Sequence, residues 1–437
     1  MHRPADDLQA PPGVYRERTR EVDVPGPPTA PLEAEVAVIG AGFTGLSAAL
    51  HLAESGARVA VLEAKSVGWG ASGRAFGQLV PYLKHDHAAT LRHYGPERGA
   101  RIVDAVAAGP NLVYGLVDRH GIDCDLVRSG LLFAAHSPAG ARSLAARAAY
   151  WQGRGAAVEM LDTAGTEAAL GSRAYDTALL DRRGGHLVPY AYAHGLARAA
   201  LAAGAAIHER TPVRAIVRQA GRWRLDAGTA GVRAESVIIA ANAYGRQLWP
   251  GLAESVVPMR GHGMASRPIS DNLSRAILPG GQPLTDTRRL YSGVRLLASG
   301  RLHISLAGPA AGPERNPPLA AADARVASLF PDLGKLEWAE QWSGWVALTV
   351  DMFPRVHELA PGLYAGLGYS GRGICAATMI GRELALRLAG TDEAELAFPL
   401  SPLKPLPAHG FSAWALRPLS TVYGLLDALD ERRAGRR

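Results

Sequence analysis

The stretch from Ala34 to Glu63 constrains the fold of this chain more than any other part of its sequence. It opens with a short apolar run, Val36 to Ile39, which is typical of a buried parallel strand. A Gly-x-Gly-x-x-Gly turn then leads into apolar residues at helical spacing, and Gly56 ends that run as a helix C-cap does. A second apolar run, Arg58 to Leu62, carries Glu63 at its end. The pattern therefore predicts a strand–helix–strand unit that binds a dinucleotide.

Each glycine of this turn has its own task. Gly40 makes the tight turn, Gly42 lets backbone N–H groups approach a pyrophosphate, and Gly45 lets the helix pack closely on the strand. The helix N-terminus adds a positive dipole for the phosphates. Glu63 would accept hydrogen bonds from a ribose 2′-hydroxyl and would repel a 2′-phosphate, so FAD or NAD is favoured over NADP.

Two further glycine-rich loops favour FAD over NAD. In Gly68–Gln78 small residues let the backbone lie flat against a ligand, while Ser72 and Arg74 can contact a phosphate. The loop Gly366–Ile374 also leads into a helix, whose N-terminus would stabilise negative charge on a reduced flavin ring. NAD binding requires neither loop. The alternatives are a surface loop for the first and an ordinary strand-to-helix turn for the second.

Composition sets broader limits. The 437 residues are 48% apolar and 20% charged, as in ordinary globular proteins of two or three domains. Residues 1–31 are polar and proline-rich, so we expect no signal peptide. The longest apolar stretch, around Ala34–Leu62, is interrupted by Gly, Glu, His and Arg, so we expect no membrane span. Cys124 and Cys375 offer no disulfide framework and suit a cytoplasmic protein. The net charge of +7 comes largely from scattered arginines, we see no nucleic-acid module, and we interpret basic residues 431–437 as a solvated tail.

The order of the patterns predicts an α/β chain (α+β overall) with a discontinuous Rossmann-type domain and an inserted antiparallel-sheet domain. A periodic, alanine-rich pattern predicts one long helix from Thr90 to Gly121, and period-two patterns predict strands after Pro212. We expect an N-terminal arm (1–33), an FAD-binding domain (34–83, 155–255 and 341–400), a substrate domain (84–154 and 256–340) and a C-terminal tail with a helix (401–437).

Four features carry a resemblance to a known family. They are the arm before the first strand, G-A-S-G-R-x-x-G-Q at Gly70–Gln78, G-I-D-C-D at Gly121–Asp125, and G-Y-S-G-R-G at Gly368–Gly373. With them the chain resembles the D-amino-acid oxidase superfamily of FAD-dependent oxidoreductases, and within it the gamma-glutamylputrescine oxidase branch. The likeness runs over residues 12–430.

The resemblance implies hydride transfer from a C–N bond of an amine or amino acid to flavin N5, followed by imine hydrolysis. In oxidases of the group, O2 then reoxidises the flavin and yields H2O2. The resemblance also implies a set of cofactor-binding residues, some through their backbone. They are Gly40, Ala41, Gly42, Phe43, Thr44, Gly45, Glu63, Ala64, Lys65, Gly70, Ala71, Ser72, Gly73, Arg74, Gly77, Gln78, Val213, Ala240, Ala241, Asn242, Trp342, Gly344, Gly371, Arg372, Gly373 and Ile374.

The chain departs from the branch at three points. Ala75-Phe76 replaces the usual Asn-Gly and reshapes the wall near the flavin ring. Arg372 replaces the usual His and would bind a carboxylate or phosphonate. Ala347 lies near the position of the cysteine that links covalent flavin in some relatives, and Gly68–Gln78 contains neither Cys nor His, so we expect non-covalent FAD.

Candidate catalytic and substrate residues are Tyr291, Arg260, His262 and Arg372. We expect Tyr291 on a strand lining the pocket, with core packing as the alternative. Arg260, like Arg295, would pair with a substrate anion or else tie the domains together, and His262 would be a base or a structural histidine. The tract Lys84–His87 holds two imidazoles but no partner cluster, so we expect no metal.

Three functions from different classes fit these patterns. The first is an FAD amine or amino-acid oxidase using O2, and the second is a flavin dehydrogenase that passes electrons to a quinone or a partner protein. The third is a flavoprotein subunit that binds without turnover. The substrate class (primary amine, N-methyl amine, amino acid or aminophosphonate) and the oligomeric state stay open.

Overall fold

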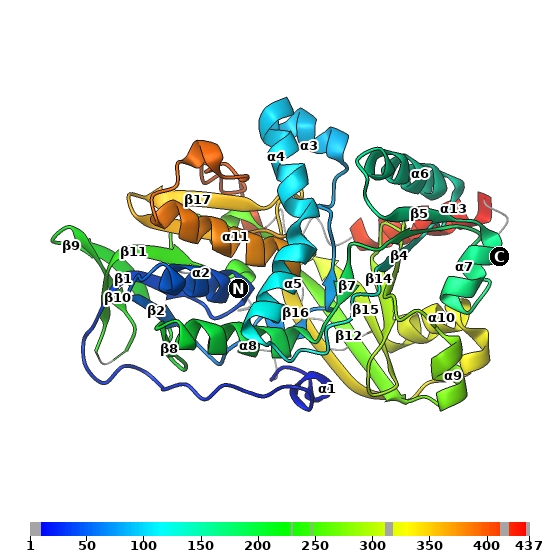
Figure 1. Ribbon diagram of the computed structural model, residues 1–437, viewed down its shortest axis with the longest axis horizontal. Coiled ribbons are helices and arrows are strands. Elements are labelled where there is room, and N and C mark those ends of the chain that lie inside the picture. The colour runs from blue at the N-terminus through cyan, green and yellow to red at the C-terminus, as the bar shows by residue number, and fades with distance from the viewer. Residues whose placement is uncertain (1–9, 229, 246–247, 311–317, 411–418, 434–437) are drawn as a thin grey trace.

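The computed structural model describes residues 10–228, 230–245, 248–310, 318–410 and 419–433. Two eight-stranded sheets lie beside each other along the long axis of the molecule, with helices covering both (Figure 1). A third, two-stranded sheet pairs β3 (Gln78–Leu79) with β7 (Gly185–His186). The mixed α/β fold with two large sheets agrees with the prediction.

The first sheet is the dinucleotide-type sheet. Its path is β17-β18-β11-β1-β2-β8, in which β1 pairs in parallel with β2 and β11, and β18 pairs in parallel with β11. The strands are β1 (Leu32–Ile39), β2 (Val59–Leu62), β8 (Ala206–His208), β11 (Val232–Ile239), β17 (Arg355–Ala360) and β18 (Leu363–Leu367). Every residue of β2 is buried, which explains its continuous apolar run.

A layer of helices covers one face of this sheet. Helix α2 (Phe43–Glu54) packs against α8 (Pro189–Ala202) and α11 (Gly373–Leu388), and all three contribute to one apolar core. Close packing explains the third glycine of the turn, because a Cβ on Gly45 would lie 2.0 Å from the carbonyl oxygen of Gly40.

Strand β11 corrects a detail of the sequence patterns, which predict two separate strands at Val232–Glu235 and Val237–Ala240. The first half pairs with β10 (Arg222–Asp226), itself paired with β9 (Ala215–Gln219), whereas the second half pairs with β18. Its other edge pairs with β1 throughout. One strand therefore belongs both to the antiparallel β9-β10-β11 meander and to the parallel part of the sheet. Its hydrophobic pattern changes where its neighbour changes from β10 to β18.

The second sheet has the path β16-β12-β15-β14-β13-β4-β6-β5 and is mainly antiparallel. Its strands are β4 (Leu131–Ala134), β5 (Val158–Leu161), β6 (Ala178–Asp181), β12 (Val257–Pro268), β13 (Leu284–Asp286), β14 (Ser292–Leu296), β15 (Arg301–Ala310) and β16 (Trp338–Leu348). The pairing of β5, β6 and β16 here differs from the predicted boundaries, which put 155–255 and 341–400 wholly in the FAD-binding domain. The parallel pair of β4 with β13 joins distant segments, and no local pattern signals it.

The long helix predicted from Thr90 to Gly121 is wrong. The segment forms α3 (His87–Tyr94), α4 (Pro96–Ala107) and α5 (Gly109–His120). Gly95 has φ of 80°, and Pro96 and Pro110 each lie in the first turn of a new helix, where a proline lacks no needed N–H bond. Because α5 packs against α8 and α11, it joins the helical layer of the first sheet rather than the predicted substrate domain.

The remaining described helices cover the second sheet, apart from α1 in the N-terminal arm (Figure 1). They are α1 (Gly13–Arg16), α6 (Pro138–Gln152), α7 (Thr163–Leu170), α9 (Asp271–Ala276), α10 (Leu319–Leu329) and α13 (Leu419–Arg433). Residues 10–31 of the predicted arm run along the molecule, and Tyr15 is buried with its hydroxyl donating to the Ala75 carbonyl at 3.0 Å. Residues 1–9 of the arm and 434–437 of the basic tail lie outside the described ranges.

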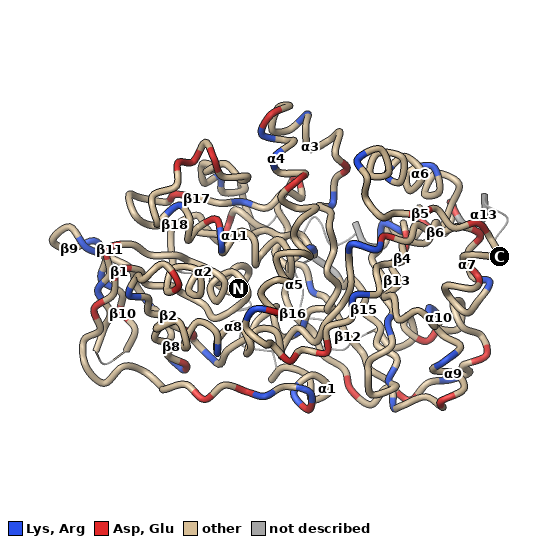
Figure 2. The backbone as a smooth tube through the Cα atoms, viewed as in Figure 1, with Lys and Arg blue, Asp and Glu red and all other residues tan. Residues whose placement is uncertain are grey.

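Charged residues are scattered over the molecule. Lys and Arg are interspersed with Asp and Glu along the tube in Figure 2, as expected for scattered arginines. A search of the described residues found no helix with the length and apolarity needed to cross a membrane.

Candidate functional site

A cavity of about 2000 Å³ runs from the glycine turn after β1 to the strands of the second sheet. The turn, the loop after β2, the loop before α11 and strands β12, β15 and β16 all contribute to its walls. Both large sheets therefore contribute to one continuous site, whose volume is large enough for a dinucleotide together with a small substrate.

The glycine turn forms one end of the cavity. Glu63 accepts hydrogen bonds from the backbone N–H groups of Ala41 and Lys65, both at 2.8 Å. Burial raises the pKa of the Glu63 carboxyl. A Cβ on Gly42 would lie 2.9 Å from Ser72 Oγ, so the turn and the next loop approach each other as only glycine permits. These groups fit the ADP half of FAD.

The loop after β2 is held by its own side chains. The Arg74 guanidinium lies over the Trp69 ring at 4.6 Å and donates to the Gly70 carbonyl at 3.0 Å. Gly77 has φ of 96°, and a Cβ there would lie 2.3 Å from the Leu187 carbonyl oxygen. Gln78 lines the cavity, and its buried Nε2 has no hydrogen-bond partner in the part of the chain that the structure describes. A buried donor without a partner at this point fits a bound polar ligand such as a flavin.

The loop before α11 forms the opposite wall. Ser370 and Gly371 both have positive φ, 49° and 83°, and the backbone then enters α11 at Gly373. Asn242 fixes the start of this loop, because its Oδ1 accepts the Gly368 N–H at 3.1 Å. The N-terminus of a 16-residue helix consequently borders the cavity at Gly373 and Ile374, where it favours negative charge.

Most of the residues expected to bind FAD line this cavity. Their roles in binding remain proposals. The lining includes Gly40, Gly42, Phe43, Thr44, Glu63, Ala64, Lys65, Gly70, Ala71, Ser72, Arg74, Gly77, Gln78, Val213, Ala240, Ala241, Asn242, Gly344, Gly371, Arg372, Gly373 and Ile374. Ala41, Gly45, Gly73 and Trp342 lie behind the lining; Trp342 Nε1, for example, donates to the Arg74 carbonyl at 3.1 Å.

Among the four catalytic candidates, Tyr291, His262 and Arg372 line the cavity and Arg260 does not. Arg260 is 1% exposed, donates to Ser343 Oγ at 2.9 Å and lies over the Trp345 ring at 4.3 Å. Arg295 is equally buried and contacts the Tyr15 hydroxyl and the Leu187 carbonyl. Neither arginine is therefore placed to bind a substrate anion, and both serve packing.

Tyr291 lies one residue before β14 rather than within the predicted strand. Its carbonyl still accepts from the Ala307 N–H of β15 at 3.1 Å, which ties it to the sheet. The Phe76 ring meets it edge-on at 6.4 Å, so the Ala75-Phe76 departure does shape this wall. Burial raises the pKa of the Tyr291 hydroxyl, which keeps it neutral.

Several lining residues escaped the sequence reasoning. Lys84 reaches the cavity, although the sequence marked it only as part of a histidine-containing tract. The two histidines of that tract face different neighbours: His85 Nε2 lies 2.6 Å from the Asp351 carbonyl, and His87 stacks on Tyr150. The C-terminal segment also contributes, through Tyr423 of α13 among others, and no sequence motif signals this.

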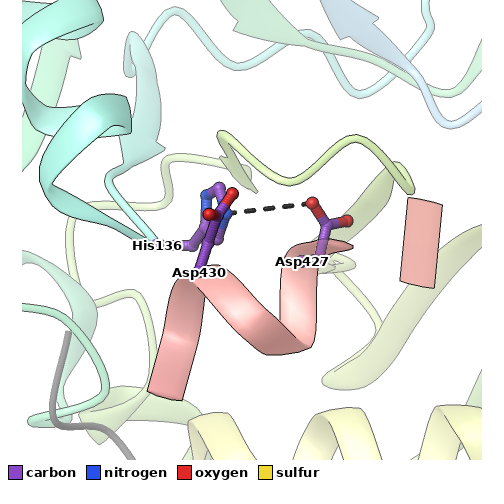
Figure 3. Close-up of side chains that lie close together, drawn as sticks. All are labelled: His136, Asp427 and Asp430. Atoms are coloured by element: carbon purple, nitrogen blue, oxygen red, sulfur yellow. Dashed lines mark ion pairs between the residues drawn. The ribbon is translucent and has the colours of Figure 1, made fainter. Parts of the chain in front are cut away.

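A separate cluster of His136, Asp427 and Asp430 has the residue types of a metal site (Figure 3). His136 Nε2 lies 3.9 Å from Asp427 Oδ1, the dashed line in Figure 3. Arg289, however, already places its Nη1 2.7 Å from Asp427 and 2.8 Å from Asp430. Because a guanidinium balances both carboxylates, we interpret the cluster as a structural ion-pair network.

Comparisons with known proteins agree with this geometry. The model of the family described as FAD dependent oxidoreductase matches residues 35–387. Gamma-glutamylputrescine oxidoreductase of Escherichia coli (strain K12) is 32% identical, over 85% of this chain and 88% of that protein. The crystal structure of glycine oxidase from Geobacillus kaustophilus superposes with a TM-score of 0.72 and 27% identity, covering 86% of this chain and 99% of that one. The L-proline dehydrogenase of P. horikoshii shares the fold, with a TM-score of 0.69 and 18% identity over 84% and 96% of the two chains.

Proposed function

This chain belongs to the FAD-dependent oxidoreductase family whose model spans residues 35–387, and from that premise we propose that it oxidises a C–N bond in an amine or amino acid that carries an acidic group. FAD supplies the acceptor for the hydride that leaves the carbon next to nitrogen. Hydrolysis of the resulting imine and reoxidation by O2, with release of H2O2, complete the proposed reaction. The names gamma-glutamylputrescine oxidoreductase and glycine oxidase, which denote amine and amino-acid chemistry in two relatives, support the proposal.

The chain's own residues have three tasks in this proposal. The turn at Gly40 and Gly42, with Glu63 beside it, holds the ADP half of the cofactor through backbone N–H groups and a carboxylate. The N-terminus of α11 stabilises negative charge at the other end. The walls formed by Phe76 and Tyr291 exclude water and orient the substrate carbon, which is the larger part of catalysis when the cofactor carries the chemistry.

Arg372 is the residue that supports an acidic group on the substrate. Its guanidinium lines the cavity, and within the described residues it makes neither a side-chain hydrogen bond nor an ion pair. Its ring neighbour is Phe133 of β4, at 5.9 Å. Burial and the nearby Arg147 lower its pKa to about 10, so it stays charged at neutral pH. A charged guanidinium that lines a cavity, without a partner among the described residues, is stabilised by a carboxylate or phosphonate brought by the substrate.

The test is an anaerobic flavin-bleaching screen with matched pairs of compounds. Each pair joins an amino acid to the alkylamine of equal chain length, so that only the acidic group differs. The parent enzyme is expected to reduce its flavin with the acidic member at least about tenfold faster, since a charge-assisted pair contributes about 1.5–3 kcal/mol. Arg372→Leu should abolish this preference while keeping its FAD content. Bleaching by no amine, at any pH, would refute the proposed function.

We further propose that FAD is held without a covalent bond. Cys375 lines the cavity, but burial raises the pKa of its thiol to about 12. A neutral thiol is a poor nucleophile, so attachment there is disfavoured. Acid precipitation of the yellow protein should release all of the flavin into the supernatant, and flavin retained in the pellet would contradict this.

The dehydrogenase alternative differs only in the electron acceptor. Proteins named glycine oxidase and L-proline dehydrogenase both share this fold, so the fold alone does not decide the electron acceptor. Measuring H2O2 during aerobic turnover separates them: one equivalent per substrate oxidised supports the oxidase, whereas rapid bleaching with little peroxide supports transfer to a quinone or protein.

A further inference from the structure

Lys84 lies between two walls of the cavity, one formed by Tyr291 and the other by Gly371 in the loop before α11. We call this part of the cavity the substrate end. Its Nζ lies 5.8 Å from the centroid of the Tyr291 ring, on the side of the second sheet. On the other side it lies 4.0 Å from the point that a Cβ on Gly371 would occupy, next to the N-terminus of α11. Glycine at 371, with φ of 83°, leaves room for the lysine. The amine is thus held inside the cavity between the two elements that define the substrate end.

Lys84 has no counter-ion among the residues that the structure describes. Within the described residues its side chain makes neither a hydrogen bond nor an ion pair. The charged neighbours are Arg372 on the loop before α11 and, behind it, Arg147 on α6. The Tyr291 hydroxyl stays neutral, because burial raises its pKa, so it offers no negative charge to the amine. Desolvation and the Arg372 charge disfavour the protonated form of Lys84, and the Tyr291 ring opposes them only weakly.

Desolvation by the surrounding protein and, second, the Arg372 charge lower the pKa of Lys84 to about 7, although its side chain exposes surface to the cavity. Lys84 and Arg372 consequently differ in kind at neutral pH. Arg372, with a pKa of about 10, is a fixed charge, whereas Lys84 exchanges a proton near the working pH. His262, the base candidate from the sequence, has its pKa lowered to about 4 by burial, so it accepts a proton from an ammonium group far less readily.

We propose that Lys84, as a neutral amine, takes the proton from the ammonium group of the substrate before oxidation; this proposal rests on the proposed amine oxidation. In this step one N–H bond of R–CH2–NH3⁺ breaks and one N–H bond to Nζ forms. The products are R–CH2–NH2 and the protonated lysine, and no electrons leave either partner. The neutral amine holds the lone pair that drives loss of hydride from its carbon. The lysine later releases its proton to solvent.

The transfer is energetically feasible because the site acts on both partners. A free alkylammonium has a pKa of about 10, roughly three units above that of Lys84, which would cost about 4 kcal/mol. The same burial and the same Arg372 charge lower the pKa of a bound ammonium group too. A substrate carboxylate on Arg372 cancels that charge and raises the pKa of Lys84, which brings the two values closer.

The first test is the pH dependence of kcat/KM in the anaerobic reduction of the FAD-loaded enzyme. In the parent, kcat/KM should rise about tenfold per pH unit below about pH 7 and then level, as Lys84 loses its proton. Lys84→Met should lose this limb and fall by about a hundredfold at neutral pH. The loss should shrink towards about pH 10, where the free amine is already neutral. Lys335→Met, at an exposed site, is the control and should match the parent.

The second test needs no substrate. Titration of Lys84 beside the flavin should shift the absorbance of bound FAD with a midpoint near pH 7 in the parent and in Lys335→Met, and Lys84→Met should not show it. A Lys84→Met profile that keeps the limb near pH 7, or an equal loss at pH 7 and about pH 10, would overturn the proposal. If no amine reduces the flavin at any pH, the proposed function fails, and the absorbance titration still decides whether Lys84 titrates.

Discussion

Asp427 of α13 accepts a hydrogen bond from the backbone N–H of Leu290, at 3.1 Å, and so ties the C-terminal helix to the residue before Tyr291. The same carboxylate accepts from the Arg289 N–H at 3.2 Å and is 4% exposed. Figure 3 shows it beside His136 and Asp430. Since Arg289, Leu290 and Tyr291 all line the cavity, a helix distant in sequence holds the substrate wall in place.

We expect Asp427→Ala to lower the free energy of unfolding by about 1–3 kcal/mol, because two partly buried backbone N–H groups, those of Arg289 and Leu290, lose their acceptor. The KM for the amine should rise as the Tyr291 wall loosens, while FAD content stays unchanged. Thermal melts and steady-state kinetics measure both. Asp430→Ala is the control, since that residue contacts the Arg289 side chain and should cost less than about 1 kcal/mol. Equal KM values in both variants would show that α13 does not position the wall.

Gly45→Ala should prevent FAD binding. The new Cβ would lie 2.0 Å from the Gly40 carbonyl oxygen, so α2 must move away from β1, at a cost of about 1–3 kcal/mol. Gly115→Ala in α5 is the matched control, because its Cβ meets open space, and it should stabilise the protein by about 0.5–1 kcal/mol. Flavin absorbance after purification reports the first effect and melting temperature the second. A yellow, fully loaded Gly45→Ala protein would contradict the role of the turn.

Glu63→Ala should weaken FAD binding by about 1–3 kcal/mol, or roughly tenfold to a hundredfold in Kd. The substitution removes the acceptor of the Ala41 and Lys65 N–H groups as well as the proposed ribose contact. Fluorescence titration of the apoprotein with FAD gives the Kd. Glu235→Ala, at an exposed ion pair with Arg222, should bind FAD as the parent does. An unchanged Kd for Glu63→Ala would argue against this assignment of the cavity.

Neither cysteine should react with Ellman's reagent at about pH 8 in the folded protein. Burial raises the pKa of both Cys124 and Cys375 to about 12, so the reactive thiolate is scarce far below that pH. Both thiols should react after unfolding, where the pKa returns to about 8.5. Rapid modification of one thiol in the native state would show that it is less enclosed than in the structure.

The sequence could predict those features that depend on residues close together in the chain. The turn at Gly40, the loop after β2 and the loop before α11 follow from rules that operate over a few residues, so these segments were recognisable together with the cofactor class. Helix breaks at Pro96 and Pro110 were visible in the same way, and the long-helix prediction missed them. The family follows from these motifs and from the match over residues 35–387.

Contacts between distant segments decided the rest. Arg260 and Arg372 look alike as residues in the sequence, yet Arg260 packs on Trp345, whereas Arg372 lines the cavity without a side-chain partner among the described residues. Lys84 acquires a pKa of about 7 because folding places it in the cavity wall beside Arg372, which lies far along the chain. The Ala34–Glu63 sequence thus determined the cofactor end by local geometry. The substrate end was decided only by tertiary structure, since burial and the electrostatic field at a side chain depend on the whole packed surroundings.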